Sequence, residues 1–216
     1  MVKGNGMPIP LVIRAPFGGV TPGELVQDEN NEAWFGSAPG LNIVIPSTPY
    51  DAKGLMKAAL QSKSPVLFME HKGLYKTKGE VPEEEYVVPM GKAAVRREGK
   101  DLTVLTYGNM VGKSLEAAET LAAEGVDLEV VDLRSVLPLD EETILASVRK
   151  TGRVVICHEA RKIGSIGGEV AAVITEKAFD ALKAPILRVA SPNVPGNCPP
   201  SIADLVAGVK QVAGCR

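Results

Sequence analysis

Two histidines and one glycine-rich run are the residues of this sequence whose types and positions could do chemistry. His71 follows an apolar run of strand length at 66–70, and His158 ends another at 154–158. Sites in open α/β sheets lie at the carboxyl ends of parallel strands, so both imidazoles are candidate acid–base groups. His158 precedes Glu159, but successive strand residues point to opposite faces, which prevents a simple acid–base pair within that strand. A hydrogen-bonded structural histidine is the alternative at both positions.

The glycine-rich run, residues 164–168, stands between a predicted strand and a predicted helix. Glycine at such a turn lets phosphate approach the backbone amides, so the run is the one candidate for a nucleotide site. Its spacing differs from the dinucleotide-binding fingerprint, and Ser191-Pro192 stands where an acidic ribose partner is expected. We therefore favour the alternative that these glycines allow a close contact between helix and sheet.

The overall composition is that of a globular chain without a charge-driven partner. Its 216 residues are 45% hydrophobic, and 24 basic against 26 acidic side chains leave a net charge of −2, which favours neither nucleic acid nor an anionic membrane. No apolar run reaches the roughly 18 residues of a membrane span. Cys157, Cys198 and Cys215 lack metal-ligand spacing and indicate reduced thiols, with a disulfide or zinc site as the alternative. We expect a cytoplasmic location, or the mitochondrial matrix or a plastid in a eukaryote.

Apolar runs of strand length alternate with helical patterns along the chain, which predicts an α/β fold with parallel strands. The predicted strands are residues 10–14, 42–45, 66–70, 102–107, 128–132, 154–158 and 186–189. The predicted helices are residues 48–62, 110–124, 141–150, 167–181 and 201–212. Glycine, the residue that most easily takes the left-handed closing conformation, ends two of them at Gly125 and Gly152.

The pattern predicts two structural units of unequal completeness. Residues 76–100 are rich in charged and turn-forming residues, and we interpret them as a linker. Residues 101–216 hold four strands and four helices in alternation, enough for a complete doubly wound domain. Residues 1–75 offer only three strands and one well-formed helix, so half of a sheet is expected to be missing. An unpaired apolar strand near residues 11–13 would need a covering partner.

Longer strings of the sequence resemble the β subunit of the decarboxylating component of pyruvate and branched-chain 2-oxo-acid dehydrogenase complexes. The most specific string is Ser47-Thr48-Pro49-Tyr50-Asp51-Ala52-Lys53-Gly54-Leu55, and residues 10–16, 32–35, 39–41, 80–86, 132–135, 138–140 and 150–153 follow the same family in order. The resemblance implies the C-terminal half of a pyrimidine-binding domain of transketolase type over residues 1–75, followed by a complete transketolase C-terminal-like domain over residues 101–216. It also implies that Met1 falls in the middle of the pyrimidine-binding domain.

The function implied by this resemblance is that of one subunit in a larger assembly. In the family, an α subunit and a second β subunit complete a heterotetramer, two chains share each thiamine diphosphate and magnesium ion, and the acyl group passes to lipoamide on a dihydrolipoyl acyltransferase core. The ring-activating glutamate would precede Met1, so we expect this chain to be inactive alone. Pyruvate is the favoured substrate. The alternatives are a non-catalytic assembly or interaction fragment and, more remotely, an independent nucleotide-binding protein.

The resemblance also implies two sets of site residues. Gln27 stands where the family carries a histidine near the cofactor, and its amide can form hydrogen bonds but cannot transfer a proton near neutral pH. A structural potassium ion is implied, held largely through main-chain oxygens. The positions that map onto its ligands are Leu11, Ala59, Leu60, Ser62 and Ser64. Ser62 replaces an aspartate and Ser64 an asparagine, and a plain helix terminus is the alternative.

Overall fold

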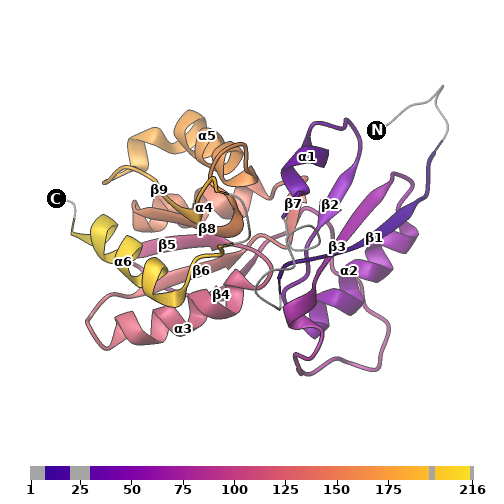
Figure 1. The fold of residues 1–216 in the computed structure, drawn as a ribbon, viewed down its shortest axis with the longest axis horizontal. Helices are drawn as coiled ribbons and strands as arrows, with labels where there is room; N and C mark the ends of the chain where they lie inside the picture. The colour runs from indigo at the N-terminus through magenta and orange to yellow at the C-terminus, as the bar shows by residue number, and fades with distance from the viewer. Residues whose placement is uncertain (1–7, 20–29, 195–197, 215–216) are drawn as a thin grey trace.

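The first of two sheets is built mainly from the N-terminal part of the chain. The computed structural model describes residues 8–19, 30–194 and 198–214. Within them, the spatial order of this sheet is β1 (Val12–Phe17), β3 (Val66–His71), β2 (Asn42–Val44) and β7 (Ser135–Leu137). The first three are parallel, and β7 runs antiparallel to β2. Figure 1 shows this sheet on the right, with α2 (Pro49–Gln61) against one face and the short α1 (Glu32–Gly36) toward the second sheet.

Helix α2 begins where the sequence predicts it. Pro49 occupies the first turn, where its missing N–H removes no hydrogen bond, and the Thr48 side chain accepts from the Asp51 N–H at 3.1 Å. Leu55 and Ala59 of the helix then pack on Val66 and Phe68 of β3 in a buried cluster. This packing fixes the helix over the middle of the first sheet.

The second sheet has the order β4 (Ala94–Arg97), β6 (Leu128–Asp132), β5 (Leu102–Thr106), β8 (Val154–Arg161) and β9 (Leu187–Ser191). All are parallel except β4, which runs antiparallel to β6. Helices α4 (Glu141–Thr151) and α5 (Ile166–Ala178) cover one face, and α3 (Met110–Ala122) and α6 (Ile202–Ala213) cover the other (Figure 1). Strands β5, β6 and β8 are buried on both faces, as their near-continuous apolar sequence predicts.

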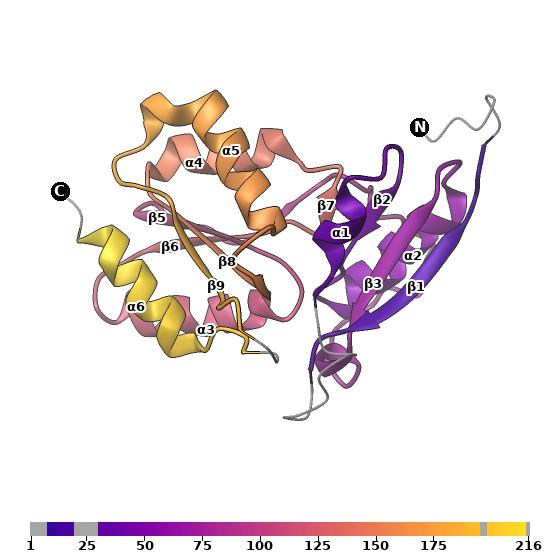
Figure 2. The same cartoon turned by 45° about the horizontal axis from the view of Figure 1, so that its top comes forward.

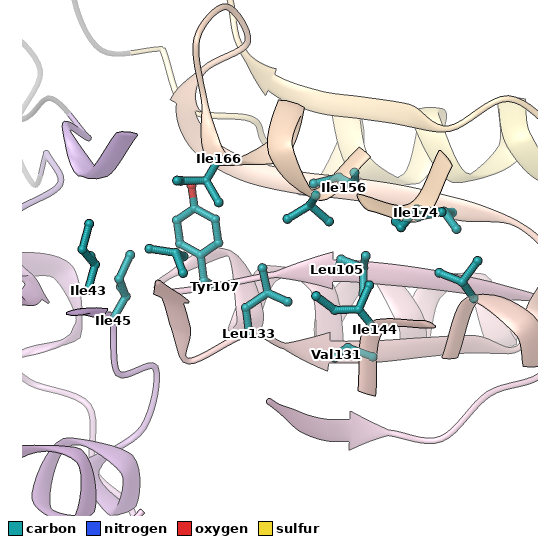
Figure 3. Packing of buried hydrophobic residues seen from close by; sticks show 14 of the residues in the cluster. Ile43, Ile45, Leu105, Tyr107, Val131, Leu133, Ile144, Ile156, Ile166 and Ile174 are labelled. Atoms are coloured by element: carbon teal, nitrogen blue, oxygen red, sulfur yellow. The ribbon is translucent and has the colours of Figure 1, made fainter. Parts of the chain in front are cut away.

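One hydrophobic core runs from the first sheet into the second. Figure 3 shows Ile43 and Ile45 on one side, Leu105 and Ile156 on the other, and the Tyr107 ring between them. Each of these side chains is at most 3% exposed. The two sheets are therefore packed through shared apolar side chains.

Strand exchange adds a second connection. β7 follows β6 in the chain yet joins the first sheet, and β4, from the segment predicted as a linker, joins the second. Neither strand is among those predicted from the sequence, and β4 lies within the 76–100 segment that was interpreted as a linker. The strands and helices that were predicted are present. Strand β8 continues past residue 158, and α5 ends at Ala178 before a 3₁₀ turn at Phe179–Ala181. The proposed domain boundaries stay a prediction.

Candidate functional site

Strand ends from the two sheets meet at one junction, and a histidine–carboxylate pair crosses it. His71 closes β3 of the first sheet, and Glu159 lies near the carboxyl end of β8 in the second. The His71 Nε2 atom lies 2.7 Å from Glu159 Oε2, and both side chains are buried. The junction therefore contains the type of pair that acid–base chemistry uses, assembled from residues far apart in sequence.

The imidazole of His71 is held in one orientation. Its Nδ1 accepts the Gly73 N–H at 3.1 Å, which places the proton of a neutral ring on Nε2, the nitrogen that lies beside Glu159. Phe17 meets the ring edge-on, with 5.1 Å between ring centroids. Gly18, at φ 78°, lies so close that an added Cβ would fall 2.2 Å from His71 Nε2. The turn after β1 must therefore carry glycine for the histidine to fit.

Glu159 is the charged partner at this junction. Burial raises the pKa of its carboxyl, but the contact with His71 and a 3.1 Å hydrogen bond from Asn109 outweigh it and leave the pKa below the usual value. The Lys113 ammonium, 3.9 Å away, acts in the same direction. Glu159 is therefore ionised at neutral pH, which suits it to orient His71.

A second buried carboxyl, Glu32 of α1, contacts the same junction. The Tyr107 hydroxyl donates to Glu32 Oε1 at 2.5 Å, and the other carboxyl oxygen of Glu32 has no hydrogen-bond partner among the residues that the structure describes. Burial raises the pKa of both groups. Because Glu32 is fully buried, it favours the neutral form more than Glu159 does, and the junction holds two carboxyls in different electrostatic environments.

His158 is turned away from Glu159, as the alternation of strand residues predicts. Its Nδ1 lies 3.1 Å from the Ala160 carbonyl oxygen and its Nε2 lies 3.2 Å from Ser165 Oγ. Burial lowers the pKa of this imidazole to about 4, so it is neutral at physiological pH. The neutral ring donates from Nδ1 and accepts the Ser165 hydroxyl at Nε2. This is the structural, hydrogen-bonded role given above as the alternative for His158.

The glycine-rich run packs α5 against the sheet. A Cβ on Gly167 would fall 2.3 Å from His158 Nε2 and 3.3 Å from an Ile156 methyl carbon. The packing interpretation of these glycines is therefore confirmed at Gly167. Sequence reasoning placed both histidines correctly but missed Glu159 as the partner of His71 and Tyr107 as the partner of Glu32. No local signal identifies such pairs, because their members come from different elements.

Buried charges form a third connection between the sheets. The Arg96 guanidinium of β4 donates to Asp132 Oδ2 at 2.8 Å and also to Asp51 of α2. Arg134 donates to Asp51 Oδ1 at 3.1 Å. Asp51 and Asp132 are fully buried, and burial raises the pKa of Asp132 to about 6 although Arg96 opposes the shift. Two arginines thus hold two buried carboxyls where α2, β4 and β6 meet.

The residues predicted for potassium lie around the end of α2 and the start of β1. The Ser62 N–H donates to the Ala59 carbonyl at 3.1 Å, the Ser62 hydroxyl donates to the Ser64 carbonyl at 2.8 Å, and the Leu11 carbonyl accepts the Val66 N–H at 2.8 Å. Gln27 lies outside the described residues. Within the described ranges, His, Cys, Asp and Glu side chains form no group of three or more that could hold a metal ion, and no helix is long and apolar enough to cross a membrane.

The fold and the sequence match two known families. Residues 91–211 match the family described as "Transketolase, C-terminal domain", and residues 1–78 match "Transketolase, pyrimidine binding domain". The chain therefore belongs to the transketolase C-terminal domain family, and the α/β fold class predicted from the sequence is confirmed.

Relatives can be named more closely. The chain is 53% identical over 192 residues to the 2-oxoisovalerate dehydrogenase subunit beta of Bacillus subtilis (strain 168), which is 88% of this chain and 59% of that protein. It is 50% identical over 185 residues to the pyruvate dehydrogenase E1 component subunit beta of the same organism, 85% of this chain and 57% of that protein. A solved structure titled "Split gene transketolase, inactive beta4 tetramer" matches with a TM-score of 0.79 and 27% identity, over 98% of this chain and 70% of that one. The chain spans just under three fifths of the length of these curated relatives.

Proposed function

We propose that this chain is the β-subunit portion of a 2-oxo-acid dehydrogenase. With an α subunit and thiamine diphosphate it would carry out oxidative decarboxylation of a 2-oxo acid, pyruvate or a branched-chain acid, and pass the acyl group to lipoamide on a dihydrolipoyl acyltransferase core. The observation that carries this proposal is the identity of 53% and 50% to two such β subunits over 192 and 185 residues. The pyrimidine-binding match over residues 1–78 supports the use of thiamine diphosphate.

The two buried carboxyls of the junction, Glu32 and Glu159, are not suited to activate a thiamine ring. A carboxylate that activates the cofactor's ring must face an open space large enough for the ring. Glu32 is fully buried against Tyr107, and Glu159 is 6% exposed and engaged with His71. Neither carboxyl fits that role. We therefore propose that a group other than these two carboxyls activates the ring, and that the paired side chains of the junction have a structural role and fix the strand ends.

The test is reconstitution. Thiamine diphosphate with magnesium is titrated calorimetrically into the purified chain alone, and then into its mixtures with an α subunit. We expect no binding by the chain alone, and both binding and release of carbon dioxide in the mixtures. Comparison of pyruvate with 2-oxoisovalerate assigns the substrate. Absence of binding and turnover in every mixture would contradict the proposal and favour the non-catalytic assembly fragment.

The role proposed for Gln27 is to form a hydrogen bond near the reacting group without transferring a proton. In the reconstituted enzyme, Gln27→Ala should lower acyl transfer because that hydrogen bond is lost. Gln27→His should retain transfer and add a pH dependence near the imidazole's ordinary pKa of about 6.5. Equal rates and equal pH profiles in all three proteins would contradict this role.

A potassium ion at the end of α2 is a further part of the proposal. The supporting argument is that a carbonyl oxygen has two lone pairs, so Ala59 and Ser64 can each bind a cation while accepting the hydrogen bonds of Ser62. The melting temperature should rise more in potassium chloride than in sodium chloride at equal ionic strength. Ser62→Asp, which adds a carboxylate ligand, should increase that difference. Equal melting temperatures in both salts for both proteins would remove potassium from the proposal.

A further inference from the structure

We draw no further inference here: the strongest candidate, the exposed apolar face that Trp34 and Phe35 of α1 form with Ile163 beside the start of α5 (Figure 2), carries none because nothing in the structure shows what covers it.

Discussion

Arg96 is the residue whose replacement tests the connection between the sheets most directly. Its guanidinium bridges the buried carboxyls of Asp51 and Asp132, and Arg134 provides a second partner for Asp51 alone. Arg96→Met keeps the apolar stem and removes the charge, so Asp132 becomes a buried carboxylate without a cationic partner. Breaking a buried ion pair from one side costs about 3–5 kcal/mol. Since the Arg96 side chain is 21% exposed and Arg134 still neutralises Asp51, we expect a loss near the lower end, about 3 kcal/mol.

The loss of unfolding free energy in Arg96→Met should increase with pH. Burial already raises the pKa of Asp132 to about 6, above its unfolded value. A raised folded-state pKa contributes stability that is present below the unfolded pKa and lost as the pH rises through the folded pKa. Removal of Arg96 raises the folded-state pKa of Asp132 further, so the variant loses more stability than the wild type above pH 6. The difference between the two proteins should therefore be large near neutral pH and smaller in acid, where Asp132 is protonated in both.

Urea unfolding followed by circular dichroism at about pH 8 and about pH 5 measures both quantities. Lys57→Met is the matched control, because it removes a cation from an ion pair whose partner, Glu85, is almost fully exposed, and it should leave the free energy of unfolding nearly unchanged. A loss for Arg96→Met no larger than for Lys57→Met would refute the reasoning. So would a large loss of equal size at both pH values, since that would point to lost packing instead of a stranded carboxylate.

Three further predictions concern single side chains, each checked by denaturant unfolding. Gly167→Ala should lower the free energy of unfolding by about 1–3 kcal/mol, because the added Cβ meets the His158 ring. Gly112→Ala is the control: its Cβ would meet none of the described atoms within 4 Å, and it should raise the free energy of unfolding by roughly 0.5–1 kcal/mol. Equal effects of the two substitutions would contradict the close contact at Gly167. Tyr107→Phe should lower the free energy of unfolding by about 1–3 kcal/mol, because Glu32 stays buried but loses its hydrogen-bond donor. An unchanged free energy of unfolding would show that this hydrogen bond does not stabilise the fold. His158 has a folded-state pKa of about 4, below the unfolded value of 6.5, so the protein should lose up to roughly 3 kcal/mol of unfolding free energy as the pH falls from 6.5 to 4. His158→Asn should flatten the dependence of the unfolding free energy on pH in that range.

The fold was predictable because most of its strands are buried on both faces. Such strands give near-continuous apolar runs, and the helices between them end at recognisable residues such as Gly152, which takes φ 72° at the end of α4. The two missed strands lack these signals. β7 has three residues, too few for any period, and β4 ends in two arginines with an irregular register against β6. Both are antiparallel edge strands whose existence depends on the sheet they join, which local sequence does not encode.

The junction was predictable only in part. The position of each histidine at a strand end follows from the apolar runs, and the alternation of strand residues correctly separates His158 from Glu159. The identity of the partner does not follow, because the Glu159 that faces His71 arrives from another sheet. The glycine in the turn after β1 is also constrained by His71. Gly18 is required by the ring of a residue more than fifty positions away, and a single sequence cannot reveal that constraint.

The strand exchange changes what the proposed domain boundary at residue 101 means physically. A unit beginning there would lack β4, which pairs with the buried β6 through Val95 and supplies Arg96 to Asp132. The same unit would retain β7, whose pairing partner β2 lies in the other part of the chain. Asp132 would then be buried without its cation, and two strands would lose their neighbours, each a destabilising change. The two sheets therefore depend on one another for stability.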